Sequence, residues 1–471
     1  MIAQQTVSYA SVTASADAIE QDAEEWWQSA AQIIRSLADQ APAGSVIRSL
    51  SFSTQGGSLV ATDASGQPLD RAIIWQDQRG KDWRHIVLDK TGAEAVYEKT
   101  GWSLGNGLNL LQIMRLRATR PGLFQRAHYY LSVADFLSLR LTGIAALDYS
   151  NGGINQLINI HEGKWDETLL ELAGIKADQL AELIPSGQVI GRLLPDIAAA
   201  LNLPPDIVLV SGGHDQYCAA LGAGAVNDRD RLIGTGTAWV LVEIARGLAT
   251  TRAVQTAVSR HVVPGLWGRL ISLPGGGASL EWFLKALPDW GTSAKTDLSL
   301  ADLDRQVQQR LLNKSGPYFF PFLSGSSYPR HVPKAQATFT HLAIGHDWID
   351  MAAAIMEGVA MQVAWTWDGF PESPVQAPVI MTGGASHSQV WRQLLANVMG
   401  SPLTMPEEKE VGCLGAAMLA AGGPGDYTDA IEACRHMSAR KIVIEPDQQS
   451  IRMQERFSQY KATYAGLFQE S

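Results

Sequence analysis

The feature that most constrains the fold of this chain is a glycine-rich turn after a short apolar segment, which occurs at three places. The turns lie at residues 212–213, 234–237 and 383–385. In open α/β sheets, ligands bind beyond the carboxyl ends of the strands, where such turns are found. Glycine lets backbone N–H groups approach a bound phosphate closely. The pattern therefore predicts an α/β protein whose turns gather around a phosphate-bearing ligand.

Strands and helices are expected to alternate along most of the chain, which indicates α/β architecture with mixed sheets. The least structured boundary lies near 226–230 and divides the chain into domains 1–227 and 228–471. The expected strands are 1–12, 46–52, 58–62, 206–210, 231–233, 239–242 and 378–381, and the expected helices begin near 20, cover most of 107–145, and span 279–287, 348–368 and 387–400.

The composition indicates a globular protein with an ample core, because 46% of the 471 residues are hydrophobic and 18% are charged. A chain of this length suits two or three domains. The 37 basic and 47 acidic residues give a net charge of −10, which argues against general binding of nucleic acid or anionic membranes. ATP remains compatible, because local amides and one cation hold phosphates within an acidic protein.

The chain begins without a basic segment followed by an apolar one, so no secretory signal is expected. Its apolar runs are too short to span a bilayer. The three cysteines have neither paired nor metal-ligand spacing, and His214 and His387 have no partner histidines at ligand spacing. We therefore expect a cytoplasmic protein without a metal cluster, and neither nucleic acid nor a membrane as its partner.

Asp215 is the candidate catalytic residue. It follows the 212–213 turn at the end of an apolar strand, where a carboxylate can accept the proton of a substrate hydroxyl as a general base. The alternative is a helix cap for residues 216–222, because Asp is favoured at that position. Taken alone, the cap is favoured, but the neighbouring 234–237 turn favours the general base and points to phosphoryl transfer.

Three segments are candidates for binding a nucleotide, each with a structural alternative. Residues 234–237, Gly-Thr-Gly-Thr, either cradle phosphate with amides and hydroxyls or form a tight hairpin. Residues 274–279 either present a helix N-terminus to a phosphate or ribose, or form a loop cap. Residues 383–388 either admit a flat group such as adenine or serve close helix–strand packing.

Residues 75–79, Trp-Gln-Asp-Gln-Arg, place Asp77 and Arg79 on one face of an extended segment. The two side chains either line a polar sugar pocket or form an ion pair at a strand end. The ion pair is the commoner arrangement and is slightly favoured here.

Six motifs occur in a characteristic order: Trp75-x-Asp77-x-Arg79, Gly213-x-Asp215, Gly234-Thr235-Gly236-Thr237, Gly277-Ala278-Ser279-x-x-Trp282, Gly383-Gly384-Ala385 and Gly412-x-x-Gly415-Ala416-Ala417. In this order they resemble the FGGY family of carbohydrate kinases, the group of xylulokinases, ribulokinases and glycerol kinases. The resemblance extends from about residue 20 to about residue 423.

The resemblance implies two actin-like (ribonuclease-H-like) domains that close over a cleft, with ATP and Mg²⁺ on one side and a sugar on the other. It implies that Asp215 is the general base and lies near the Mg²⁺ ion through water, and a homodimer is compatible with it. Sugar contacts are expected from Gln55, Asp77, Arg79 and Asp215. Nucleotide contacts are expected from Gly234, Thr235, Gly236, Thr237, Gly277, Glu281, Gly384 and Ser388.

Two departures from the family pattern bear on function. The residues after Gln55, which carry larger side chains in glycerol kinases and xylulokinases, are Gly56 and Gly57 here. The glycine pair leads us to expect more room, for a ketose or polyol of five or six carbons.

The second departure is the lack of an Asp-x-Gly-Thr-Thr segment, which in family members helps to hold Mg²⁺ and grips the ATP phosphates. Two explanations stay open: Met1 is an internal methionine of an ordinary kinase, or the chain is a non-catalytic sensor of a sugar or nucleotide. The kinase is favoured, because Asp215 and the 234–237 turn are retained. A hydrolase on the same fold would leave the motifs at 75–79 and 277–282 unexplained.

Overall fold

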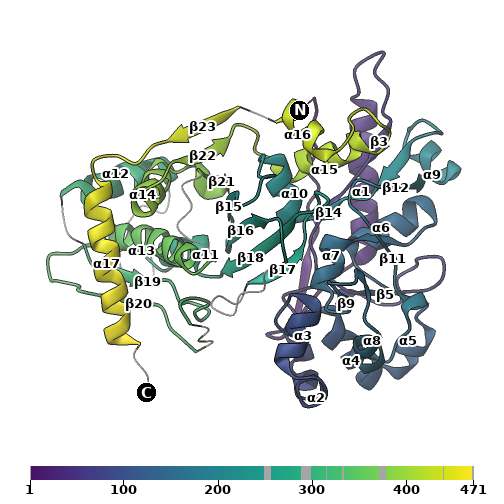
Figure 1. Ribbon diagram of the computed structural model, residues 1–471, viewed down its shortest axis with the longest axis horizontal. Helices are drawn as coiled ribbons and strands as arrows, with labels where there is room; N and C mark the ends of the chain where they lie inside the picture. The colour runs from purple at the N-terminus through teal and green to yellow at the C-terminus, as the bar shows by residue number, and fades with distance from the viewer. Residues whose placement is uncertain are drawn as a thin grey trace.

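The computed structural model describes residues 2–248, 256–287, 299–313, 316–330, 332, 334–370, 378–438 and 440–468. Figure 1 shows two parts side by side, an N-terminal part coloured purple to teal and a C-terminal part coloured teal to yellow.

The N-terminal part contains, in chain order, β1 (Ser11–Ser15), β2 (Ala18–Gln21), α1 (Ala23–Asp39), β3 (Ser49–Leu50), β4 (Ser53–Thr54), β5 (Val60–Thr62), β6 (Ala72–Ile73), η1 (Arg79–Trp83), α2 (Arg84–Lys90), α3 (Ala93–Thr100), α4 (Asn109–Thr119), α5 (Pro121–Arg126), β7 (Tyr129–Leu131), α6 (Val133–Thr142), β8 (Ala146–Asp148), α7 (Tyr149–Ile154), β9 (Ile158–Asn159), β10 (Lys164–Trp165), α8 (Glu167–Ala173), η2 (Ala177–Gln179), β11 (Glu182–Ile184), β12 (Val189–Arg192), α9 (Pro195–Ala200), β13 (Val208–Val210), β14 (Gly213–His214) and α10 (Asp215–Gly222).

The strands of the N-terminal part form short ladders: β1–β2–β6, β12–β13–β3, β14–β4, β5–β7, β11–β8 and β10–β9. β3 is parallel to β13, and β4 is parallel to β14. Helices α1 and α6 pack over this region through a buried cluster that includes Trp26 and Phe136, whose rings meet edge to face. The segments that lead to Gln55 and to Asp215 therefore run side by side.

One expectation about the N-terminal part is wrong. Residues 2–10 belong to no strand or helix, and β1 begins only at Ser11. Most of these residues are exposed and pair with no described strand, so their alternating pattern has no sheet to join. The expectation that helices cover most of 107–145 is confirmed by α4, α5 and α6. Strand β7 lies between α5 and α6, where Tyr130 and Leu131 are buried and β7 pairs with β5.

The C-terminal part contains, in chain order, β15 (Arg231–Thr235), β16 (Trp239–Ala245), β17 (Ala257–Arg260), β18 (Trp267–Leu273), α11 (Gly276–Ala286), α12 (Leu300–Asn313), β19 (Tyr318–Phe320), β20 (Thr338–Thr340), α13 (Trp348–Asp368), β21 (Val379–Gly383), η4 (Gly384–His387), α14 (Gln389–Met399), β22 (Leu403–Pro406), α15 (Val411–Gly422), α16 (Ala430–Met437), β23 (Lys441–Ile444) and α17 (Ser450–Leu467).

The C-terminal part is built on a seven-stranded mixed sheet of order β17–β18–β16–β15–β21–β22–β23. β15, β21 and β22 are parallel to one another, and the remaining neighbours are antiparallel. Because β15 and β21 are adjacent and parallel, the glycine turns that follow them lie at the same edge. The mixed sheet between helices confirms the predicted α/β class.

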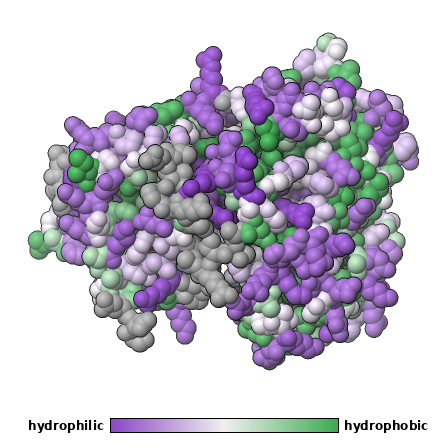
Figure 2. All heavy atoms as spheres, viewed as in Figure 1, coloured by the Kyte–Doolittle hydropathy of each residue, from purple (hydrophilic) through white to green (hydrophobic). Residues whose placement is uncertain are grey.

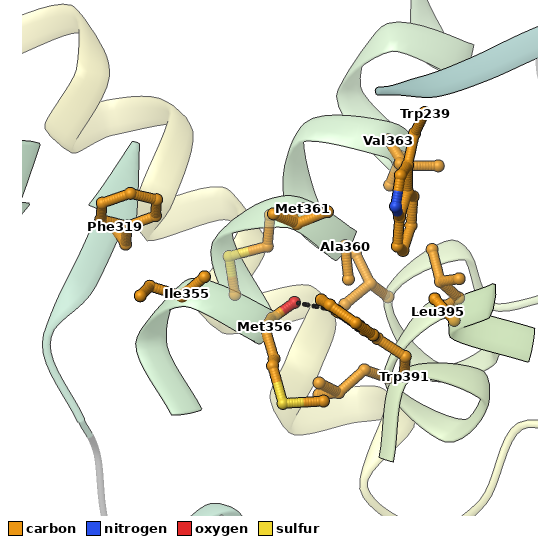
Figure 3. Close-up of a cluster of buried hydrophobic side chains, with 14 of the residues drawn as sticks. Trp239, Phe319, Ile355, Met356, Ala360, Met361, Val363, Trp391 and Leu395 are labelled. Carbon is orange, nitrogen blue, oxygen red and sulfur yellow. Dashed lines mark hydrogen bonds between the residues drawn. The ribbon is translucent and has the colours of Figure 1, made fainter. Parts of the chain in front are cut away.

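Helices cover both faces of this sheet. Figure 3 shows part of the larger core, where Trp239 of β16 packs with residues of α13 and α14, and the indole N–H of Trp391 donates to the carbonyl oxygen of Met356 at 3.2 Å. On the other face, α10 and α15 pack against each other and against the sheet through a second buried cluster. Helix α15 also contacts β3, β4 and β13, so it joins the two parts (Figure 1).

A buried charge cluster stiffens the centre of the sheet. Glu243 of β16 accepts hydrogen bonds from Arg231 of β15 at 3.0 Å and from Arg269 of β18 at 2.8 Å. All three side chains are buried. Three adjacent strands are thereby linked below the turn that follows β15.

Hydrophilic side chains cover much of the face shown in Figure 2, with smaller hydrophobic patches between them. Within the described ranges, no helix combines the length and the apolar character needed to cross a membrane.

Candidate active site

Asp215 lies at the edge where two parallel strands end together. β14 leads directly into Asp215, the first residue of α10, and β4 leads into Gln55. The Asp215 side chain is 45% exposed. His214 occupies the cap position of α10, and no side chain makes a capping hydrogen bond there. This geometry favours a carboxylate open to a ligand over the helix-cap alternative.

His214 holds the backbone just before Asp215, although it is not among the predicted site residues. Its backbone N–H donates to Oγ of Ser150 at 2.9 Å, and its ring lies 5.5 Å from the ring of Tyr217. Its Nδ1 is 3.5 Å from Oδ1 of Asp215. The sequence carries one signal for this residue, its place beside Asp215, which does not by itself indicate a contact between the side chains.

Side chains from other elements pack closely against Gly56 and Gly57. A Cβ atom on Gly56 would lie 2.6 Å from Cγ2 of Ile154 and 2.7 Å from Cδ2 of His214. A Cβ atom on Gly57 would lie 2.6 Å from Cδ2 of Leu108. The glycines thus make space for these side chains, and the expected extra room for a sugar stays a prediction.

Asp77 and Arg79 form an ion pair inside the protein. Asp77 is fully buried, and the Arg79 guanidinium lies 2.7 Å from its carboxylate and 2.6 Å from that of Glu20. Asp77 also accepts from the Ile19 N–H at 3.0 Å. The structure therefore supports the ion-pair alternative, and the burial of Asp77 does not support its expected contact with a sugar.

Two other side chains on this side remain available to a ligand. Trp75 is 47% exposed, and its Cβ lies 3.3 Å from the position of a Cβ on Gly57. Gln55 is partly exposed, and its amide donates to Gln21 at 3.1 Å. The exposed indole beside the glycine pair offers an apolar face of the kind that sugar rings pack against.

The glycine turns expected to bind a nucleotide lie in contact with one another. A Cβ on Gly277 would clash with the carbonyl oxygen of Gly236, and a Cβ on Gly383 would lie 2.5 Å from the carbonyl oxygen of Thr235. The backbone N–H of Ala278 donates to the Thr237 carbonyl oxygen, in the turn after β15, at 2.8 Å. The start of α11, the turn at 234–237 and the start of η4 therefore form one backbone cluster.

The hydroxyls of Thr235 and Ser388 are used inside the protein. Thr235 Oγ1 donates to the Thr382 carbonyl at 2.6 Å and accepts from the Ala385 N–H at 3.1 Å. Ser388 Oγ donates to Asp304 at 2.8 Å and caps α14. Both residues are buried. Their predicted contacts with nucleotide are therefore not supported for the side chains, which instead hold the turns in place.

Gly236, Thr237 and Gly384 are exposed residues. A Cβ on Gly384 would come no closer than 3.8 Å to another residue outside its immediate neighbours, so this position is open. Glu281 is exposed and lies 2.7 Å from Lys285 one helical turn later. These backbone amides are thus the groups that a phosphate could reach.

The first turn of α10 touches the turn after β15. Oε1 of Gln216 lies 3.3 Å from the position of a Cβ on Gly234. Asp215 therefore directly precedes a residue in contact with the 234–237 turn. The exposed carboxylate therefore stands one residue from a contact with the turn, and phosphoryl transfer to a hydroxyl requires a base close to the bound phosphate.

A cavity of about 560 Å³ opens beside this cluster, between the end of β21 and the segment 406–410. Gly384, His387 and Arg392 line one side, and Lys409 with three glutamates lines the other. Its volume lies within the range of small-molecule sites. Gly383 and Gly384 of the glycine-turn cluster form part of its lining.

Within the described residues, no group of three or more His, Cys, Asp or Glu side chains could hold a metal ion. Mg²⁺ commonly keeps several waters and is bound by one or two carboxylates together with substrate phosphates. The exposed carboxylate of Asp215 fits such a site.

Models of both domains of one family match the chain. The model described as "FGGY family of carbohydrate kinases, N-terminal domain" matches residues 1–222, and that of the C-terminal domain matches residues 232–423. Gluconokinase of Bacillus subtilis (strain 168) is 26% identical over 96% of this chain and 89% of the relative. Xylulose kinase of Escherichia coli (strain K12) is 26% identical over 95% of this chain and 90% of the relative.

Solved structures show the same fold. Ligand-bound xylulose kinase from Lactobacillus acidophilus aligns with a TM-score of 0.88 at 21% identity, covering 98% of this chain and 92% of its own. Gluconate kinase from the same organism gives the same TM-score, identity and coverage. Glycerol kinase from Plasmodium falciparum with ADP gives 0.87 at 17% identity, covering 98% and 93%. The predicted two-domain, actin-like architecture is thereby confirmed.

Proposed function

This chain belongs to the FGGY family of carbohydrate kinases, and we propose that it transfers the γ-phosphoryl group of ATP to a hydroxyl of a five- or six-carbon ketose or polyol, with Asp215 as the general base. The observation that carries the proposal is the exposed Asp215 carboxylate, whose neighbour in sequence, Gln216, lies against Gly234 at the start of the 234–237 turn. A residue in that position accepts the hydroxyl proton as the oxygen attacks phosphorus.

The chain's own groups account for most of the positioning. The backbone amides at 236–237 and at Gly384 would hold the phosphates, and the N-terminus of α11 lies against the same turn, where the helix dipole favours negative charge. Mg²⁺, bound near Asp215 through water, would neutralise charge on the phosphates.

The names of the relatives bear on the size of the sugar, and the ion pairs of Arg79 bear on its charge. The relatives named gluconokinase and xylulose kinase suggest substrates of five or six carbons. The Arg79 guanidinium is already paired with Asp77 and Glu20, which leaves it little positive charge for a sugar acid. This favours a neutral ketose or polyol over gluconate.

The test is ADP release by the purified chain with ATP, Mg²⁺ and a panel of xylulose, ribulose, fructose, xylitol, sorbitol, glycerol and gluconate. We expect a neutral five- or six-carbon compound to give the highest kcat/KM, with ³¹P NMR showing a phosphate monoester as product. Highest activity with gluconate would contradict the argument from Arg79. ATP hydrolysis without a phosphorylated sugar under every condition would contradict the proposed transfer.

A further inference from the structure

A second cavity, of about 200 Å³, lies where the two parts of the protein meet. Its lining includes Tyr149 at the start of α7 and Ser186 after β11, both in the N-terminal part. The opposite wall is the hairpin between β17 and β18, with Arg260, His261 and Trp267. None of these residues lines the cavity beside Gly384, so the two cavities are separate.

The hairpin is fixed to the N-terminal part by hydrogen bonds. The Val258 N–H donates to the Gly101 carbonyl at 2.7 Å, and the Trp102 indole N–H donates to Oγ of Ser259 at 2.9 Å. Both walls of the cavity are therefore held at a defined separation, which a ligand that bridges them requires.

Arg260 is held in this cavity with donors to spare. Its guanidinium carbon lies 4.6 Å from the ring centre of Tyr149 and 5.7 Å from that of Trp267. One long hydrogen bond, 3.4 Å to the Ile160 carbonyl, is its one polar contact with the described residues, and its Nε is buried without a partner there. A planar guanidinium with free donors is suited to a phosphate or carboxylate group.

His261 adds a second donor without a partner. The side chain is buried, and its Nδ1 accepts from the Val263 N–H at 3.1 Å, which places the ring proton on Nε2. Nε2 has no hydrogen-bond partner among the described residues. Burial lowers the pKa of His261 to about 3, so the ring is neutral near pH 7.

The charge of the lining also favours an anion. No Asp or Glu is among the described residues that line this cavity, although the chain as a whole carries a net charge of −10. Its volume of about 200 Å³ is well below the 560 Å³ of the cavity beside Gly384. The smaller volume favours a compact molecule with one oxyanion group.

We propose that this cavity is a second ligand site, which binds the phosphate or carboxylate group of a small metabolite on Arg260 between Tyr149 and Trp267. The occupant contacts both parts of the protein and so stabilises the arrangement in which they are joined. The inference does not depend on which sugar is phosphorylated or on the role of Asp215.

Pro264, a lining residue at the rim of the cavity, gives a test that leaves Arg260 and its aromatic neighbours unchanged. It is exposed at the tip of the hairpin, in a turn closed by a hydrogen bond from the Leu266 N–H to the Val263 carbonyl at 3.2 Å. Gly265 supplies the positive φ of 81° at the third position of the turn, and the second position accepts most residues. Pro264→Lys and Pro264→Glu therefore change the charge at the rim while sharing the loss of the proline.

Binding of inorganic phosphate, ribose 5-phosphate and succinate would be measured by calorimetry with saturating ADP present, so that the nucleotide site is occupied. We expect at least one anion to bind, with Kd lower in Pro264→Lys than in Pro264→Glu by roughly three- to tenfold, as expected for one charge reversal near the ligand. Arg260→Met should abolish binding, whereas Arg126→Met, which removes an exposed arginine of α5, should not. The succinate and phosphate arms decide which oxyanion is preferred.

Three outcomes would overturn the proposal. They are failure of all three anions to bind the unaltered protein at millimolar concentration, loss of binding when ADP is added, and equal Kd values in the two Pro264 variants. The comparison of the Pro264 variants remains decisive if Arg260→Met does not fold, because both variants keep Arg260 and its aromatic neighbours.

Discussion

The residues next to Asp215 are held from several directions. The backbone N–H of His214 is bonded to Ser150, its ring lies against Tyr217, and its Cδ2 closes the space above Gly56. The backbone at Asp215 is therefore held in place, and so are some of the side chains around its carboxylate. Proton abstraction depends on this kind of positioning, because small displacements of reacting groups lower the rate steeply.

We predict that Gly56→Ala lowers both stability and turnover. The added Cβ would lie 2.6 Å from Ile154 and 2.7 Å from His214, so at least one of these side chains must move. Overpacking of this kind costs about 1–3 kcal/mol. Because His214 also touches Asp215, kcat should fall together with the temperature of unfolding.

Gly122→Ala is the matched control, because a Cβ at this position in α5 has no other residue within 4 Å. This variant should unfold at the temperature of the unaltered protein or slightly above it. Equal stability and kcat in the two alanine variants would show that the packing around Gly56 is not tight.

Among the helices and strands, those with a complete local pattern could be predicted from the sequence. The helix expected at 348–368 is α13 with the same bounds, and the strand expected at 378–381 is β21 at Val379–Gly383. Elements that depend on distant partners could not. β7 forms because β5, nearly seventy residues earlier, pairs with it, and residues 2–10 stay outside any strand because no described strand lies beside them.

Helix α6 yields a prediction about pH. Asp135 completes the capping box of α6 by accepting from the Ser132 N–H at 2.6 Å, and it is buried. Burial raises the pKa of Asp135 from 3.8 to about 7, and the nearby carboxylate of Asp148 adds to the rise. Between these two pKa values the folded state binds the proton more strongly than the unfolded state, so stability falls as pH rises through this window.

Asp135→Asn should remove this dependence, because the amide oxygen can still accept from Ser132 but carries no ionisable group. Relative to the variant, the unaltered protein should lose up to about 1.4 kcal/mol per pH unit between about pH 4 and 7, and little more above. Urea unfolding at several pH values measures the difference. Parallel stability profiles would contradict the buried, proton-binding state of Asp135.

Across the two parts, the meeting of the glycine turns could be anticipated, but the duties of individual side chains could not. The turns at 234–237 and 383–385 follow the neighbouring parallel strands β15 and β21. The sequence indicates this arrangement, because each turn comes directly after a short apolar segment. The burial of Thr235 and Ser388 depends on Thr382 and Asp304, partners far from them in sequence or in another strand. A family motif therefore located these residues without showing that their hydroxyls are occupied.

The joint between the parts is formed by α10 and α15, which approach closely. A Cβ on Gly415 of α15 would clash with the Cys218 carbonyl of α10, the helix that begins at Asp215. We predict that Gly415→Ala shifts α10 and lowers kcat by roughly 10- to 100-fold, since a displacement of about 1 Å at reacting groups has effects of this size. Far-UV circular dichroism should show that the secondary structure is retained.

Gly422→Ala, in the last turn of the same helix, is the control. A Cβ there would make only ordinary contacts, the nearest at 3.8 Å. This variant should keep a kcat close to that of the unaltered protein. If Gly415→Ala also kept it, the close approach of α10 and α15 would not determine the position of Asp215.

The central claim, that Asp215 is the base of a carbohydrate kinase, is tested by comparing Asp215→Asn with Asp206→Asn, an exposed aspartate before β13. The sugar-dependent rate of ADP release and the Kd of ADP are measured for each. We expect Asp215→Asn to lose turnover by at least about 100-fold, the lower end for general-base catalysis. The Kd of ADP should stay nearly unchanged, and Asp206→Asn should resemble the unaltered protein in both. Full turnover in Asp215→Asn would contradict the assignment.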